Sequence, residues 1–249
     1  MLEHKKIQNL SDYFVELNSR REKGVYFYRI NGYSEEVGEF IKKYYDTARR
    51  TGVVIEGKIP NPDEGNLAYY NEIMGMDFQM SMDFIHVSLR KWLPRMNEFQ
   101  RQNVAASIYD SLDSLRKAGK TENMLRNAYI KFMCWLYYKF ERIVNQLGEN
   151  HIPKILYEGQ ISNYELMLIS ILSNAGCDVV LLQYAGDQGY LKTDPGSVLS
   201  DSLQMEGLQP FPQGYCVKKV RDEIQNEFNN ERLLSLIHIS EPTRLLSIS

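Results

Sequence analysis

The chain has 249 residues, a formal net charge of −3 and 43% hydrophobic residues, values typical of a globular protein. This near-neutral balance argues against a dedicated nucleic-acid-binding protein, which usually carries a strong basic excess. Because no apolar run reaches roughly 18 residues and the N-terminus lacks the apolar stretch of a signal peptide, we expect a cytoplasmic protein without a membrane span.

Residues 1–22 are predicted to form a leading helix. Ile7, Leu10, Tyr13 and Leu17 recur at helical spacing, which is typical of an amphipathic helix over residues 4–21. Gly24 ends this pattern.

Residues 23–94 are predicted to contain a first α/β unit. Residues 25–30 and 53–55 are β-branched, aromatic or apolar, as in strands, and residues 35–50 form a helical pattern that Ser34 can cap. The crossover is long enough for parallel pairing of the two strands. Residues 59–66 are a loop by composition.

The segment 67–94 is hard to assign because it is rich in methionine. Met74, Met76, Met80 and Met82 lie close together, and the pattern indicates either soft packing or a mobile lid. Gap-filling core is the more common role of such stretches.

Residues 95–150 are predicted to form a helical hairpin. Gly119 can end the first helix and Thr121 can cap the second, whose apolar stripe runs from Leu125 to Leu147. Residues 151–233 then repeat the strand–helix–strand pattern, with strands at 154–157 and 177–182 and a helix at 163–175. The expected fold is α/β, with Rossmann-like units, a parallel sheet and an inserted helical hairpin.

The last sixteen residues, 234–249, are expected to be foreign to the natural protein. Residues 234–244 read LSLIHISEPTR, which looks like a translated sequencing adapter. We therefore expect a truncated fragment whose native part ends near Leu233 and whose residues 215–233 form a helix. The alternative is a genuine amphipathic tail.

Familiar catalytic and metal motifs are missing from the sequence. There is no GxGxxG, GxxxxGK[ST], HExxH or GxSxG run, and the three cysteines and four histidines have no metal-ligand spacing. We therefore expect no metal site, and the sequence does not identify a cofactor or decide whether the protein is an enzyme.

Ligands of open parallel sheets bind at the carboxyl ends of the strands, which selects the candidate residues. They are Arg29, Asn31, Gly32, Glu56, Lys58, Glu158, Gly159, Ser162, Asp187 and Asp194. Residues 158–162 either hold a phosphate at the start of a helix or simply turn and cap that helix. Asp187 and Asp194 either bind a cation or a sugar hydroxyl, or serve turns.

The residues around Trp92-Leu93-Pro94, 117–132 and 153–159, with the strands near 25–32 and 176–182, resemble the bacterial YceG-like family over about residues 25–215. That family is described as a component of a biosynthetic module found with TerD-type tellurium-resistance and stress genes. Its members are about twice as long as this chain, which agrees with a fragment.

The resemblance implies a role in making a nucleotide- or sugar-phosphate-like metabolite. It supplies no catalytic residues. Two alternatives remain: a non-catalytic scaffold that binds TerD-type partners through tyrosine-rich helices, and one lobe of a glycosyltransferase-like enzyme.

Overall fold

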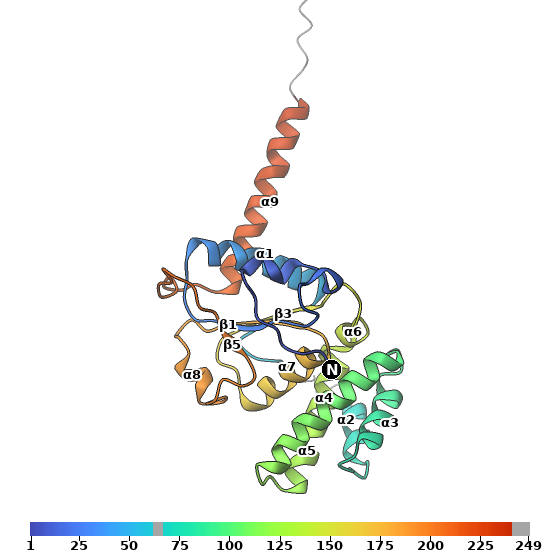
Figure 1. Cartoon of the computed structure of the whole chain (residues 1–249). Coiled ribbons are helices and arrows are strands. Elements are labelled where there is room, and N and C mark those ends of the chain that lie inside the picture. The colour runs from blue at the N-terminus through green and yellow to red at the C-terminus, as the bar shows by residue number, and fades with distance from the viewer. Residues whose placement is uncertain (62–66, 241–249) are drawn as a thin grey trace, which may run out of the picture.

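The computed structural model describes residues 1–61 and 67–240, and a parallel sheet lies at its centre (Figure 1). The strands are β1 (Phe27–Ile30), β2 (Val53–Glu56), β3 (Lys154–Glu158), β4 (Asp178–Leu182) and β5 (Asp201–Ser202). They lie in the order β2-β3-β4-β1-β5, and every pairing is parallel. The predicted α/β class is thus confirmed.

The two strands of the first predicted unit share the sheet but do not pair with each other. β1 pairs with β4 and β5, whereas β2 pairs with β3, so the expected direct pairing was wrong. Helix α1 (Glu35–Thr51) carries the chain across the two intervening strands. The burial of the strands explains this order, because β4 is buried at every position and β2 is only partly buried. A strand covered on both faces takes a central position, and a less apolar one takes the edge.

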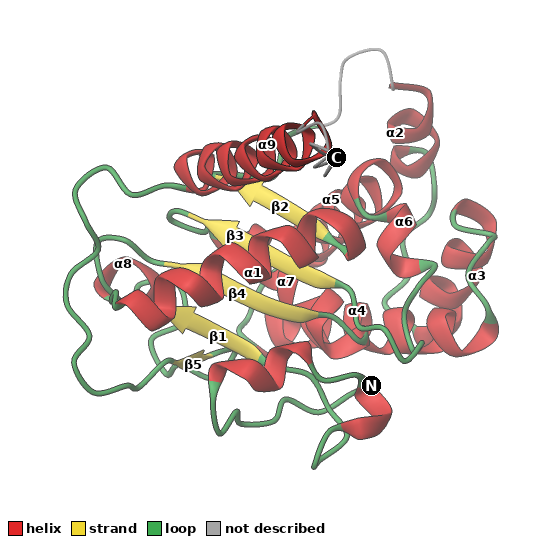
Figure 2. Ribbon diagram, turned by 90° about the horizontal axis from the view of Figure 1, so that it is seen from above, coloured by secondary structure: helices red, strands yellow, loops and turns green. Residues whose placement is uncertain are grey.

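Helices cover both faces of the sheet. In Figures 1 and 2, α1 and the start of α9 (Val217–Ser240) lie on one face, and α7 (Asn163–Ala175) and α4 (Glu98–Lys117) lie on the other. Alternate residues of β4 serve the two sides: Val179 and Leu181 join one apolar cluster, and Val180 and Leu182 join the other. This is the period of two expected for a strand.

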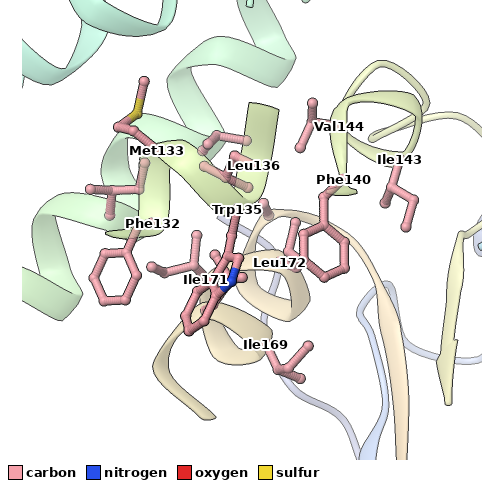
Figure 3. Packing of buried hydrophobic residues seen from close by; sticks show 14 of the residues in the cluster. Phe132, Met133, Trp135, Leu136, Phe140, Ile143, Val144, Ile169, Ile171 and Leu172 are labelled. Atoms are coloured by element: carbon pink, nitrogen blue, oxygen red, sulfur yellow. The ribbon is translucent and has the colours of Figure 1, made fainter. Parts of the chain in front are cut away.

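Between β2 and β3, which are neighbours in the sheet, the chain forms a layer of helices. It comprises α2 (Leu67–Met74), α3 (Met82–Trp92), α4, α5 (Glu122–Lys139) and α6 (Glu141–Val144). The predicted break between two long helices is confirmed, with Thr121 capping α5 through the Met124 amide. The second helix ends earlier than expected, because the backbone of Phe140 leaves the helical region. Apolar residues of α5 and α6 belong to the same apolar cluster as Ile169, Ile171 and Leu172 of α7 (Figure 3).

The leading helix predicted over residues 4–21 is replaced by two short 3-10 helices, Leu10–Phe14 and Leu17–Ser19. Leu10, Tyr13 and Leu17 are buried, so the apolar pattern identified the inward-facing residues but not the type of element. Asp12 accepts hydrogen bonds from the amides of Gln8 and Asn9. Such local bonds compete with a continuous helix.

The C-terminal helix predicted over residues 215–233 is present as α9, and Figure 1 shows it projecting from the body. Residues 234–240 of the expected foreign tail continue this helix, and residues 241–249 lie outside the described residues. Most of the loop expected at 59–66 also lies outside them. Among the described residues, no helix combines the length and apolarity needed to cross a membrane.

Candidate functional site at the carboxyl edge of the sheet

The strands change winding direction between β4 and β1. The chain leaves β1 toward β2 and leaves β4 toward β5, on opposite sides of this pair. Open α/β sheets bind ligands at such a point. Ile30, Leu182 and Glu158 are in register on neighbouring strands, so Asn31 and Gly159 follow at the same edge. Figure 2 shows the arrowheads of β1, β3 and β4 on one side.

Glu158, the last residue of β3, joins three elements. Its Oε2 accepts hydrogen bonds from the Tyr184 hydroxyl at 2.5 Å and from the Val217 amide at 2.8 Å. Val217 is the first residue of α9, so the carboxylate also compensates the positive end of that helix. Burial and the contact with Glu158 raise the pKa of Tyr184. The phenol therefore stays protonated and remains a donor to Glu158.

Four partly exposed aromatic side chains lie beside Glu158: Tyr33, Tyr184, Phe211 and Tyr215, here called the aromatic cluster. Their ring centroids lie between 5.0 and 5.8 Å apart in the pairs that touch. All four side chains are partly exposed, so the rings do not bury one another completely. The cluster therefore gives the carboxyl edge an apolar surface next to a carboxylate.

Arg29 of β1 is committed to Asp187. Its guanidinium donates to both carboxylate oxygens of Asp187 at 2.7 and 2.8 Å, and to the carbonyl and hydroxyl of Ser200. It also lies 4.2 Å above the Tyr190 ring. Burial opposes the charge of Arg29, but Asp187 outweighs it and raises the Arg29 pKa. This ion pair attaches the segment containing α8 (Gln188–Leu191) to the sheet, and Asp187 compensates the positive charge of Arg29.

Asp194 is buried and orders its own turn. It accepts from the Tyr190 hydroxyl at 2.8 Å and from the amides of Val198 and Leu199 at 3.0 and 2.9 Å. Asp187 instead faces Arg29, and Tyr190 stands between the two acids. The contacts of Asp194 match the turn interpretation of this residue.

Asn31 and Gly32 leave β1 beneath the segment that follows β5. The Asn31 side-chain amide donates to Ser202 Oγ at 2.9 Å, while its Oδ1 is buried without a hydrogen-bond partner among the described residues. A side chain on Gly32 would press on Leu208 and on the carbonyl of Gln209, each within 3.2 Å of an added Cβ. Glycine thus lets this segment cross closely over the strand end.

Ser162 caps α7. Its hydroxyl accepts from the Glu165 amide, and the Glu165 carboxylate accepts from the Ser162 amide and hydroxyl in a capping box. Glu165 also accepts from the Ile59 amide and the Tyr157 hydroxyl. A carboxylate therefore already occupies the positive end of α7, where the sequence alone left a phosphate site open.

Gly159, Glu56 and Lys58 lie at the turns after β3 and β2. The Gly159 amide donates to the Leu182 carbonyl at 3.2 Å, and its φ of +97° favours glycine. Glu56 pairs with Arg221 of α9 at 2.8 Å on the surface, and Lys58 is exposed. Of these residues, Lys58 offers a cation to solvent near the strand ends.

A cleft of about 420 Å³ opens beside the end of β5 and is here called the β5 cleft. Residues 201–205 line one side, residues 6–10 line another, and Tyr28 and Glu36 complete it. Its volume falls in the range of small-molecule sites. Since Ser202 also bonds to Asn31, the cleft adjoins a predicted site residue.

Sequence reasoning missed Tyr33, Phe211 and Tyr215. Tyr33 directly follows the predicted Asn31-Gly32 turn and could have been included by the strand-end rule. Phe211 and Tyr215 come from a segment without periodicity, and only the folded chain brings them to β1 and β4. No local sequence pattern marks Phe211 or Tyr215 as site residues.

Comparison with known proteins identifies the family. A family model described as the YceG domain matches residues 5–223, which include all the described strands and the aromatic cluster. Neither the curated proteins nor the solved structures provide a match. Because the family model covers most of the chain, this protein belongs to the YceG domain family.

Proposed function

We propose that this chain binds a nucleotide- or sugar-phosphate-like metabolite at the carboxyl edge of its sheet, as a cytoplasmic component of a Ter-associated bacterial stress and biosynthetic module. The observation that carries the proposal is the aromatic cluster beside Glu158, at the point where the winding of the sheet reverses. The Rossmann-like interpretation of the two strand–helix–strand units is part of this proposal.

The chemistry of the edge suits a ring that carries hydroxyl groups. A base or sugar stacks against the aromatic cluster, and a hydroxyl donates to the Glu158 carboxylate, which Tyr184 holds in place. Asp187 already compensates Arg29, so the exposed Lys58 is the better candidate to meet a phosphate.

The scaffold alternative receives less support from the tyrosine pairs. Tyr44, Tyr45 and Tyr69 are buried in the chain's own core, and Tyr69 stacks on Tyr137 with centroids 3.9 Å apart. Tyr44, Tyr45 and Tyr69 therefore stabilise the fold, whereas Tyr70 is 41% exposed and Tyr137 and Tyr138 are partly exposed. The glycosyltransferase-like alternative makes the same prediction of a bound nucleotide sugar, so the ligand panel below also tests it.

Thermal unfolding with a panel of nucleotides, nucleotide sugars and sugar phosphates tests the proposal. A ligand present at about 100 times its Kd should stabilise the fold by about 2.7 kcal/mol and raise Tm. Glu158→Gln should remove the shift, whereas Glu39→Gln, on the exposed side of α1, should retain it. Tyr184→Phe keeps the ring and should weaken the shift.

Two results would contradict metabolite binding at this edge. The first is that no ligand of the panel raises the Tm of this protein while TerD-type proteins co-purify with it. This result would favour the scaffold alternative. The other is a ligand shift that Glu158→Gln leaves unchanged, since the binding site would then lie elsewhere.

A further inference from the structure

Four of the ten methionines fall within nine residues, Met74–Met82, here called the methionine loop. They form two Met-x-Met pairs, Met74-Gly75-Met76 and Met80-Ser81-Met82. The loop joins α2 to α3 in the helical layer. Met74 and Met80 also pack against the main apolar cluster, but this packing does not require sulfur at all four positions.

The burial of these side chains differs from that of core methionines. Met96 and Met133, which do fill the core, are 2% and 0% exposed. By contrast, Met82 is 39% exposed, and Met74, Met76 and Met80 are partly exposed. Met74 and Met76 line one cleft of about 470 Å³ together with Asp77, Phe78 and Glu122. Both side chains are therefore partly exposed at this cleft.

The backbone anchors both ends of the loop and leaves its middle irregular. Arg126 of α5 donates a hydrogen bond to the Met74 carbonyl, and Ser81 caps α3 by accepting from the Phe84 amide at 3.1 Å. Between these anchors the loop carries no helix or strand. Met76 and Met80 lie in this irregular part, while Met74 ends α2 and Met82 begins α3.

Thioether sulfur is a soft, uncharged ligand that favours Cu(I), whereas hard cations prefer oxygen. We propose that the methionine loop binds Cu(I), or its soft analogue Ag(I), through Met74 and Met76, with Met80 or Met82 completing the set of sulfur ligands. Asp77, Glu122 and Arg126 line the same cleft, so two carboxylates face one guanidinium there and leave a net negative charge for a bound cation. This site is independent of the proposed metabolite site.

The test is an Ag⁺ titration of the full chain in chloride-free buffer, followed by Cu(I) competition against a bicinchoninate chelator. All proteins carry Cys216→Ser, because this partly exposed thiol would compete for soft metals. Cys134 and Cys177 are buried, and burial raises the Cys134 pKa to about 11 and moves the Cys177 pKa in the same direction. Both thiols therefore stay protonated and enclosed.

The loop variant is Met74→Leu with Met76→Leu, and its matched control is Met167→Leu with Met205→Leu, two partly exposed methionines elsewhere. Leucine keeps the size and apolarity of methionine, so both variants should fold. We expect one Ag⁺ per chain. The loop variant should lose affinity for Ag⁺ by at least about tenfold, because even the loss of a residue that only supports a metal ligand costs that much. The control should bind like the parent.

A second pair, Met80→Leu with Met82→Leu, guards against misfolding of the first. This variant should also bind Ag⁺ more weakly. In methionine-methyl NMR spectra of the parent protein, Ag⁺ should shift the methyl signals of the loop and leave those of Met96 and Met133 unchanged. The proposal is overturned if the parent binds no Ag⁺ or Cu(I). It is also overturned if both folded loop variants bind as tightly as the control.

Discussion

The buried carboxylate of Asp178 joins several segments at the amino ends of the strands. It accepts two hydrogen bonds from Arg20, one from Lys154 at 2.5 Å and one from the Tyr26 amide at 2.9 Å. The side chains of Arg20 and Asp178 are fully buried. Burial lowers the Lys154 pKa, and Asp178 opposes that shift. One acid thus ties the N-terminal segment, β3 and β4 together.

Replacement of Asp178 by alanine should therefore be severe. It leaves two buried cations without their partner, for which we expect a loss of about 3–5 kcal/mol in the free energy of unfolding. Asp46→Ala is the matched control, because Asp46 pairs with Arg49 and Arg50 on the surface of α1 and should cost about 1 kcal/mol or less. Urea unfolding measures both, and equal losses would contradict this role for Asp178.

His4 should make stability depend on pH. Burial lowers its pKa below the ordinary 6.5, Asp201 opposes the shift, and Nε2 lies 2.9 Å from Ser173 Oγ. The unfolded chain therefore binds this proton more readily than the folded one, so stability is complete above about pH 6.5 and falls as the pH drops below it. In His4→Gln, the decrease in Tm between pH 7 and pH 5 should be shallower. A parallel decrease in both proteins would show that other groups cause it.

At the level of single residues, the strand-end rule grouped Asn31, Gly32, Glu158 and Gly159 at one edge, where the structure also places them. It could not reveal that Arg29 is neutralised by Asp187, 158 residues away in the chain. Such a pairing depends on the fold of the segment after β4. The charge of Arg29 is therefore already compensated within the fold.

At the level of elements, Gly52 joins α1 to β2 in close contact with β3. A Cβ at this position would lie 1.7 Å from the Lys154 carbonyl oxygen, which is backbone and cannot turn aside. Gly52→Ala should therefore cost about 3 kcal/mol, the upper part of the usual range for overpacking.

Gly75→Ala provides the control for Gly52. The nearest atoms to a Cβ at Gly75 lie at 3.4 Å, so the change should alter stability by less than about 1 kcal/mol. Chemical unfolding of both variants checks the pair. A mild effect at Gly52 would mean that α1 and β3 can separate at little cost.

Local patterns predicted α1, α7, α9 and the break between α4 and α5, because caps and apolar periodicity act within a few residues. They failed for residues 4–21, where side chains of Asn9 and Asp12 bond to the backbone. They also could not give the order of the strands. That order follows from which strands are buried on both faces, a property of the assembled sheet.

At the level of the whole molecule, one apolar cluster links the helical layer to the sheet. It includes Leu112 and Tyr129 from the helices, Leu172 from α7, and Ile155 and Val179 from the strands. The helical hairpin predicted as a separate unit of residues 95–150 thus shares its core with the second α/β unit. We expect the two to unfold together.

Thermal unfolding checks this coupling. Fluorescence of Trp92 and Trp135 reports on the helical layer, and far-UV circular dichroism reports on all helices and strands. The two transitions should coincide. Leu172→Ala leaves a cavity in the shared core, so it should lower the free energy of unfolding by about 2–5 kcal/mol and shift both transitions to the same lower temperature. Val87→Ala, at a 60% exposed position, is the control. Two separate transitions would show independent units.

A nucleotide- or sugar-phosphate-like metabolite bound at the carboxyl edge of the sheet, as proposed above, should protect the backbone around it from hydrogen exchange. Hydrogen–deuterium exchange of the full chain, with and without each member of the ligand panel at saturating concentration, tests it most directly. We expect slower exchange in residues 158–162 and 203–216, where Glu158 and the aromatic cluster meet. Protection confined to other segments, or none with any ligand, would contradict it.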